Sequence, residues 1–174
     1  EHYPGSVLQR CTVFLSTHDT PRILTVFLEN QPSWERAIRL EQLAALMQFC
    51  LPGMPCVCYG DEAGREGGAD PDNRRPYPWG RENRRLLEWY RTLGGLRRRC
   101  PALGTGSFSC GAASESLLWL RRSRDGQDLV LYLYTGDAPV SVPGRKCLLE
   151  LGAEVRPDSV VLNPFSAALL AADE

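Results

Sequence analysis

Two stretches of this sequence decide the expected fold: TVFLSTHDTP at residues 12–21 and MPCVCYGDEAG at residues 54–64. Each opens with a short apolar run that is typical of a strand and then turns into a polar loop. Between them, residues 33–51 repeat apolar side chains every three or four positions, which predicts a helix that ends at Pro52-Gly53. The same periodicity predicts a second helix from about Arg81 to Arg99, before Pro101.

Strand, helix, strand and helix, with a polar loop after each strand, is the pattern of parallel βα units. In sheets of this kind the functional side chains lie in the loops that follow the carboxyl ends of the strands. The loops over residues 16–21 and 60–79 are therefore the places where this sequence is expected to carry its chemistry.

The pattern changes after Pro101. Short strands are expected over residues 115–122, 128–135, 140–142, 147–151 and 159–162, bounded by turn pairs such as Asp125-Gly126 and Asn163-Pro164. Turn signals at this spacing predict an antiparallel sheet or a small sandwich. We therefore expect one domain over residues 1–102 and a second over residues 103–174.

Composition narrows the class of protein. The chain has 174 residues and a net charge of −1, which excludes a basic nucleic-acid-binding surface. It lacks the run of ~18 apolar residues that a membrane helix needs, and it is too short for a complete eight-stranded barrel of ~250 residues.

Its seven scattered cysteines are an odd number, which favours reduced, buried thiols in a cytoplasmic protein over a disulfide framework. The cysteine spacing indicates no metal site, and the sequence implies no cofactor.

The first loop places His18 and Asp19 side by side. An imidazole next to a carboxylate offers a donor and acceptor pair for vicinal hydroxyl groups, such as those of sugars. Arg22, three residues later, could hold the carboxylate of Asp19 ionised. The plainer alternative is that Asp19 and Thr20-Pro21 only form a turn or cap a helix.

The second loop, over residues 60–79, is rich in glycine, acids and arginines and ends with Tyr77 and Trp79. Acidic and arginine side chains hydrogen-bond sugar hydroxyls, and aromatic faces stack on sugar rings. The alternative is a solvated loop whose Asp–Arg pairs only hold its own shape.

These residues resemble the α-amylase family, glycoside hydrolase family 13. Residues 14–22 are similar to its fourth signature region, and residues 53–64 resemble its eighth barrel strand and the loop that follows. Residues 70–76 resemble the Asp-Pro-x-x-Arg segment of the branch that contains cyclomaltodextrinases, neopullulanases and maltogenic amylases. The order and spacing fit across roughly residues 1–103.

The resemblance implies a fold and a set of roles. The fold is the last two βα units of a (β/α)8 barrel, followed by an antiparallel β-sandwich. Asp19 matches the third catalytic carboxylate, and His18 matches the histidine that hydrogen-bonds the same sugar. Asp70 and Arg74 match the pair that holds the next glucose of an α-glucan oligosaccharide. Asp61 and Glu62 match positions that mainly support the loop.

The family's retaining mechanism also needs a nucleophile in a Gly-x-Arg-x-Asp pattern and a glutamic acid on the next strand. The nearest stretch, residues 120–126, lacks the leading glycine and reads as a hairpin turn. We therefore expect a C-terminal piece of an α-glucan hydrolase that is inactive alone. Its open strand edges predict self-association, or association with the rest of the barrel.

A non-catalytic function is the alternative: the sandwich could bind glycans or another protein. Trp119, Tyr132 and Tyr134 could stack on sugars, but they alternate along strands. Aromatic residues in that pattern more often belong to a core.

Overall fold

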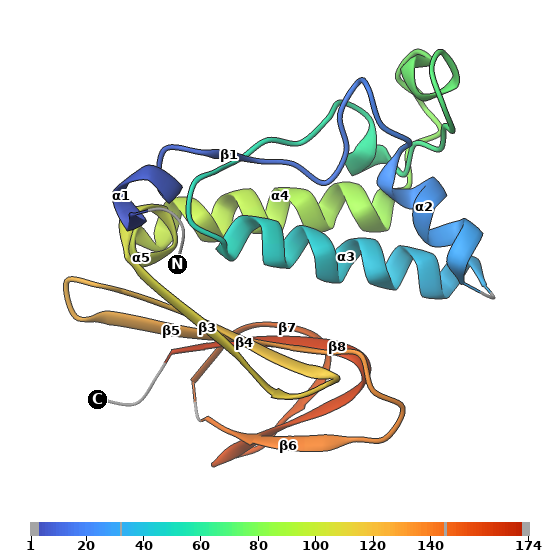
Figure 1. Ribbon diagram of the computed structural model, residues 1–174. Coiled ribbons are helices and arrows are strands. Elements are labelled where there is room, and N and C mark those ends of the chain that lie inside the picture. Colours follow the sequence, from blue (N-terminus) through green and yellow to red (C-terminus); the bar gives the residue numbers. More distant parts are fainter. Residues whose placement is uncertain (1–3, 32, 145, 172–174) are drawn as a thin grey trace. The chain divides into compact units, whose positions relative to one another are not determined.

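The computed structural model describes residues 4–31, 33–144 and 146–171 (Figure 1). These residues form two compact units. The first comprises residues 12–49 and 55–96, and the second comprises residues 4–11, 50–54 and 97–171.

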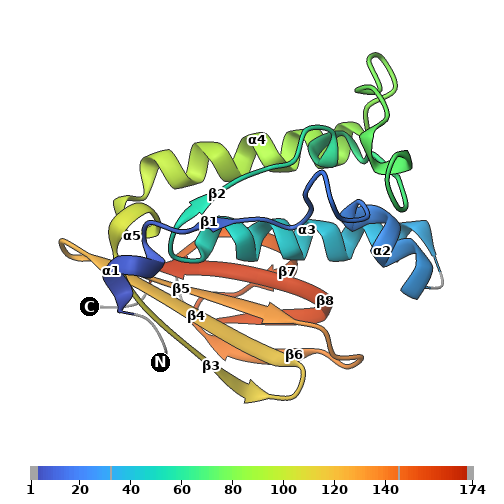
Figure 2. The same cartoon turned by 45° about the horizontal axis from the view of Figure 1, so that its top comes forward.

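Two short strands, β1 (Thr12–Val13) and β2 (Met54–Pro55), lie side by side at the start of the two decisive stretches (Figure 2). The amide of Met54 donates to the carbonyl of Cys11 at 2.8 Å, and the amide of Cys56 donates to that of Val13 at 2.9 Å. Because the residue numbers rise together on both sides, the pairing is parallel, as the sequence predicts. Both strands are shorter than expected, since each pairs with one neighbour only in the described residues.

Three helices accompany these strands: α2 (Ile23–Asn30), α3 (Trp34–Cys50) and α4 (Arg84–Arg99). The two longer ones are the helices that the periodicity predicts. They pack on each other, with the indole of Trp89 donating to the carbonyl of Gln42 at 2.9 Å (Figure 1). No pattern in the sequence predicts α2, because its run ILTVFLEN is short and five of its first six residues are apolar. Its Leu24 is fully buried with residues of α3 and α4.

The long loop after β2 contains two 3-10 turns, η1 (Asp61–Ala63) and η2 (Asp72–Arg74). At Gly67 its two arms approach each other closely. A Cβ there would lie 2.6 Å from the Cα of Asn73, so that only glycine permits this approach. The loop is thereby folded on itself beside the end of β1.

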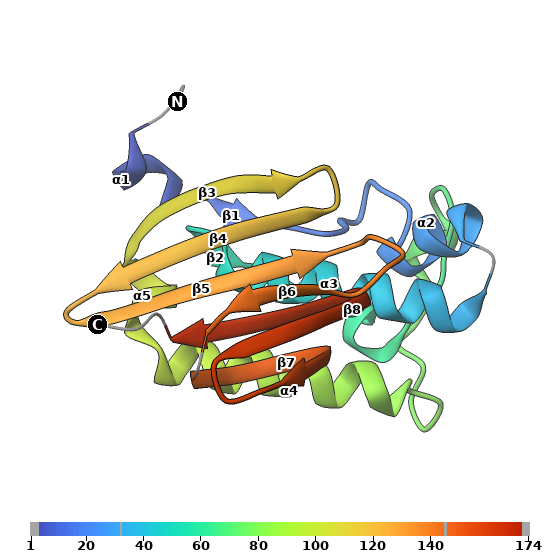
Figure 3. The same ribbon diagram turned by 90° about the horizontal axis from the view of Figure 1, so that it is seen from below.

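The second unit contains two short helices, α1 (Gly5–Leu8) and α5 (Pro101–Thr105), and an antiparallel sheet (Figure 3). Its strands are β3 (Ser107–Ser114), β4 (Leu117–Arg124), β5 (Gln127–Tyr134), β6 (Val140–Pro143), β7 (Lys146–Val155) and β8 (Ser159–Ala171). The order is β3-β4-β5-β8-β6, and β7 also pairs with β8.

The antiparallel pattern is confirmed, but two strands differ from the prediction. Strand β3 is rich in Ser, Gly and Ala, which are poor strand formers, and no local signal predicts it. The turn expected at Asn163-Pro164 is instead a bend within β8, where Phe165 has a φ of 55°. Residues before the bend pair with β6 and residues after it pair with β5, so the strands belong to one continuous curled sheet (Figure 3).

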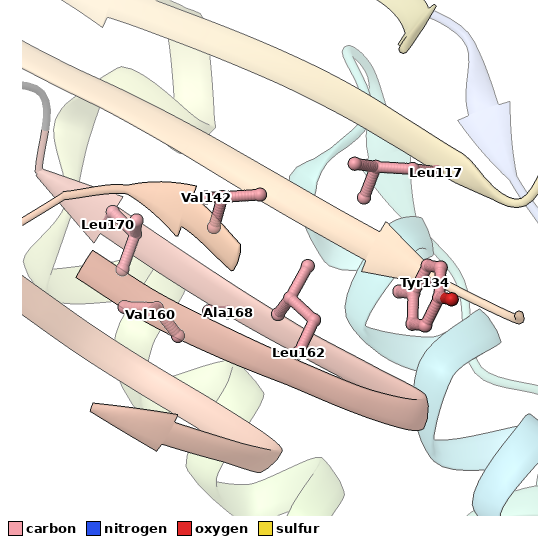
Figure 4. Packing of buried hydrophobic residues seen from close by; sticks show 7 residues of the cluster. All are labelled: Leu117, Tyr134, Val142, Val160, Leu162, Ala168 and Leu170. Atoms are coloured by element: carbon pink, nitrogen blue, oxygen red, sulfur yellow. The ribbon is translucent and has the colours of Figure 1, made fainter. Parts of the chain in front are cut away.

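The core of this unit is an apolar cluster on the curled sheet (Figure 4), made of Leu117, Tyr134, Val142, Val160, Leu162, Ala168 and Leu170. Tyr132 packs against it, and Trp119 covers Gly111, where a Cβ would lie 2.8 Å from the indole. The large apolar side chains that stay exposed on the described sheet are Leu118 and Val155. Tyr134 is therefore a core residue, and Tyr132 and Trp119 are partly buried and pack against neighbouring residues, as their pattern along the strands predicts.

Each of the seven cysteines is a free thiol, as predicted. Cys50 and Cys100 are buried, and burial raises the pKa of Cys50 to about 12. The prediction of burial is wrong for Cys11 and Cys110, which are exposed.

In the described part of the chain, no helix is long and apolar enough to cross a membrane. Those residues also contain no cluster of three or more side chains able to hold a metal ion.

Candidate functional site

His18 and Asp19 lie together in the loop that follows β1. The Nε2 atom of His18 is 3.1 Å from Oδ2 of Asp19, and their side chains are 70% and 69% exposed. The amide of Thr17 donates to the hydroxyl of Thr20 at 2.8 Å, which closes the turn below them. This arrangement leaves both functional groups open to a ligand.

The second loop brings Asp70 and Arg74 to the same place. Arg74 Nε lies 2.8 Å from Oδ1 of Asp70, and Arg74 Nη2 lies 3.5 Å from Oδ1 of Asp19. Arg74 also donates to the carbonyl oxygen of His18 at 3.1 Å. The four side chains that the sequence predicts as site residues thus form one continuous chain of polar groups, although Asp19 and Arg74 are 55 positions apart.

We call this series, His18–Asp19–Arg74–Asp70, the exposed polar chain. Its carboxylates can accept hydrogen bonds from hydroxyl groups, and its guanidinium and imidazole can donate to hydroxyl oxygens. Exposed ion pairs are weak, so a polyhydroxylated ligand can exchange with them at little cost.

Arg22 lies elsewhere than predicted. It directly precedes α2, its side chain is 1% exposed, and Nη1 lies 3.1 Å from Oδ1 of Asp61. It also donates to the carbonyl oxygens of Tyr59 and Asn73, each at 2.7 Å. The expectation that Arg22 holds the Asp19 carboxylate is therefore wrong; Arg74 occupies that position, because Arg22 turns inward to bind the second loop.

Asp61 is buried on the other side of this ion pair. It accepts a hydrogen bond from the hydroxyl of Ser16, so that it joins the end of β1 to the loop after β2. Burial raises the pKa of the Asp61 carboxyl, while Ser16 and Arg22 partly counteract it. Asp61 thus supports the loop, as the resemblance implies, and Glu62 does the same by accepting from the amide of Gly60 at 2.8 Å.

Asn73, which no motif in the sequence singles out, is buried under the exposed polar chain. Its Nδ2 atom donates to the carbonyl oxygens of His18 at 2.8 Å and Thr20 at 2.9 Å. A side-chain amide that spans two backbone carbonyls from a distant loop has no local sequence signature. We name Ser16, Arg22, Asp61 and Asn73 the buried network.

Glu41 lies in the middle of α3 and is fully buried. Neither of its carboxylate oxygens has a hydrogen-bond partner among the described residues. Burial raises the pKa of Glu41 well above its ordinary value, and the nearby Asp61 and Glu62 raise it further. A neutral carboxyl group is therefore favoured behind the site.

The aromatic end of the second loop is exposed. The rings of Tyr77 and Trp79 lie 4.5 Å apart, and Trp79 is 80% exposed. The exposed indole provides a flat apolar face, and the ring of Tyr77 is tilted by 50° from it.

Comparison with known proteins shows which proteins this chain resembles. Residues 6–86 match the family model of the alpha amylase catalytic domain. An amylopullulanase of Thermoanaerobacter thermohydrosulfuricus is 39% identical over 74% of this chain and 9% of its own length. A cyclomaltodextrinase of Geobacillus thermopakistaniensis is 31% identical over 98% of this chain and 30% of its own length.

The chain also resembles solved structures of named enzymes. The native debranching enzyme of Nostoc punctiforme superimposes with a TM-score of 0.83 at 26% identity, over 98% of this chain and 37% of that one. In sequence, the chain also matches proteins named neopullulanase and maltogenic alpha-amylase.

These homologues are glycoside hydrolases of the α-amylase family, so the resemblance seen in the motifs is confirmed. The chain spans less than a third of the length of the amylopullulanase and of the cyclomaltodextrinase.

Proposed function

We propose that this chain supplies part of the substrate-binding site of a retaining α-glucan hydrolase, because residues 6–86 match the alpha amylase catalytic domain. The observation that carries the proposal is the exposed polar chain. Two loops that are distant in sequence present His18, Asp19, Asp70 and Arg74 together, above a buried network that fixes their backbone.

Each member of the exposed polar chain has a role in this proposal. In a retaining glycosidase the sugar at the cleavage point becomes an oxocarbenium-like cation in a distorted ring. The Asp19 carboxylate would bind hydroxyls of that sugar more strongly in the distorted form, which lowers the barrier. His18 would donate to the same sugar, and Asp70 with Arg74 would hold the next glucose of the α-glucan.

The nucleophile and the general acid must come from another segment of polypeptide in this proposal. We place β1 and β2 as the seventh and eighth strands of a (β/α)8 barrel, and the curled sheet as the C-terminal sandwich. The parallel pairing of β1 and β2 supports that placement. A barrel completed by further strands would bring two more carboxyl groups to the same end of the sheet.

Activity assays test the proposal. The 174-residue chain is expected to release no reducing sugar from cyclodextrin, pullulan or starch. Turnover that disappears in Asp19→Asn would show that the chain contains a complete site. In a full-length protein that carries this sequence, Asp19→Asn is expected to lower kcat/KM by about 100-fold or more. An unchanged kcat/KM would remove Asp19 from the site.

Binding to the isolated chain provides a second test, because half a site can still hold a sugar. Maltoheptaose is expected to bind at millimolar concentration, with NMR shift changes at the exposed polar chain. Arg74→Gln should weaken this binding, and Asp137→Asn, an exposed carboxylate in the second unit, should leave it unchanged. Equal loss in both variants would contradict the assignment.

Self-association, or pairing with the rest of the barrel, is also part of the proposal. Phe14 beside β1 is 50% exposed. A hollow of about 330 Å³ within the first unit is lined by apolar side chains that include Phe49, Val57 and Leu87. Such surface favours association in water. Light scattering is expected to show species larger than 19.4 kDa, and a strictly monomeric chain would contradict this part of the proposal.

A further inference from the structure

The first unit contains a second hollow that includes none of the proposed sugar-binding residues. It has a volume of about 390 Å³ and lies between the start of α3, the arm of the loop after η1, and the start of α4. Arg65, Arg75 and Arg81 line it from the loop, and Trp34 and Asn83 line it from the helix starts. One lining carboxylate, Glu66, accompanies these three guanidinium groups.

The arginines around this cavity are poorly neutralised. Arg75 pairs with Asp72, but the side chains of Arg65 and Arg81 form no ion pair among the described residues. The Nε atom of Arg65 is buried and lacks a hydrogen-bond partner there. Burial lowers the pKa of Arg65, and the charges of Arg75, Arg22 and Arg81 lower it further. An anion in the cavity would relieve the repulsion between these guanidinium groups.

Two helix starts add to this preference for negative charge. Ser33 accepts from the amide of Arg36 at 3.3 Å before α3, and Asn83 accepts from that of Leu86 at 3.1 Å before α4. The helix dipoles thus point their positive ends toward this part of the unit. The cavity is larger than a bare phosphate ion, and Trp34 is 43% exposed at its edge. The lining therefore fits a charged head group with a flat, partly apolar body.

We propose that this cavity binds an organic phosphate of sugar size, with its phosphoryl oxygens on Arg65 and Arg81 and its body on Trp34. The site is independent of the proposed glucan-binding function, since the two share no side chain. Inorganic phosphate has the same phosphoryl oxygens as an organic phosphate. The experiment therefore compares the binding of the two ligands.

Titration calorimetry on the 174-residue chain tests the proposal with three probes: glucose 6-phosphate, inorganic phosphate and glucose. Glucose 6-phosphate is expected to bind best, inorganic phosphate more weakly, and glucose not at all. Added salt should weaken phosphate binding. Arg81→Gln changes an exposed side chain, and it is expected to reduce the affinity at least about tenfold.

Two variants and one control complete the test. Arg65→Gln should have an effect similar to that of Arg81→Gln. Trp34→Ala should reduce binding of glucose 6-phosphate but not of inorganic phosphate. Arg91→Gln, an exposed arginine outside this cavity, should bind like the unchanged chain.

Three results would overturn the proposal. Absence of binding by either phosphate at millimolar concentration would show that the cavity is not a phosphate site. Equal loss in Arg81→Gln and Arg91→Gln would show that the attraction is not specific to this cavity. Inorganic phosphate that binds as tightly as glucose 6-phosphate would refute the part of the proposal that concerns the sugar body.

Discussion

The first unit uses aspartate and arginine in two layers with opposite properties. In the exposed polar chain, Arg74 bridges Asp19 and Asp70 while it is 46% exposed. In the buried network, Arg22 bridges Asp61 and two backbone carbonyls while it is 1% exposed. Water competes with the first set of contacts and is excluded from the second.

This difference separates residues that are free to bind a ligand from residues that hold the loops in place. An exposed pair contributes little to folding, so its groups can turn to a substrate. A buried pair cannot open without leaving an uncompensated charge in the interior. Substitutions in each layer test this division, in order of expected effect on stability.

The largest effect is expected from Arg22→Met. The change leaves the Asp61 carboxylate buried without its cation and removes donors to the carbonyls of Tyr59 and Asn73. The expected loss in the free energy of unfolding is about 3–5 kcal/mol at pH 7, measured by urea denaturation. The matched control Arg74→Met should lose less than about 1 kcal/mol. Similar losses in both variants would show that the two layers do not differ as described.

Asn73→Ala should have the next largest effect. It removes the two hydrogen bonds to the carbonyls of His18 and Thr20, and we expect a loss of about 1–3 kcal/mol. Amide hydrogen exchange over residues 17–20 should become faster. Asn163→Ala removes an exposed amide that binds one carbonyl in the second unit, and it should leave exchange in residues 17–20 unchanged. If amide exchange over residues 17–20 is as slow in Asn73→Ala as in the unchanged protein, the side-chain amide of Asn73 does not support this loop.

Glu41→Gln is expected to stabilise the protein at neutral pH. Burial raises the pKa of Glu41, so the folded state holds this proton more tightly than the unfolded state. The contribution of Glu41 to stability is therefore fully present below the ordinary glutamate pKa and falls as the pH rises through the folded-state value. We expect Tm to rise by roughly 2–5 °C at pH 7, with the gain shrinking toward pH 4.

Glu35→Gln is the control for that pH profile. Glu35 lies on the same helix with its side chain 78% exposed, paired with Arg85. Its substitution should change Tm little at any pH. A Glu41→Gln gain that does not depend on pH would show that charge burial is not its cause.

The smallest effect on stability is expected from Asp70→Asn, within about 0.5 kcal/mol, because its ion pair with Arg74 is exposed. Maltoheptaose affinity, measured by NMR titration, should fall in the same variant. A single substitution would then weaken sugar binding without changing the free energy of unfolding. A large loss of stability would show that Asp70 contributes to folding in the same way as the residues of the buried network.

Local patterns along the chain are enough to predict much of this arrangement. Apolar periodicity predicts α3 and α4, the spacing of turn signals predicts most strands of the curled sheet, and the loop after the first strand singles out His18 and Asp19. Asp70 and Arg74 are singled out by the resemblance of residues 70–76 to a family segment. Each of these signals lies within a window of a few residues, where side-chain spacing dictates which face is buried.

Long-range contacts decide which polar residue serves which layer. Arg22 and Arg74 are both near an aspartate in the sequence, yet Arg22 turns inward to Asp61 and Arg74 reaches Asp19 from a loop 55 positions away. Asn73, the isolated carboxyl of Glu41, and the curl of β8 at Phe165 also depend on partners far along the chain. Burial and long-range pairing arise only when distant segments meet, and for that reason no local pattern encodes them.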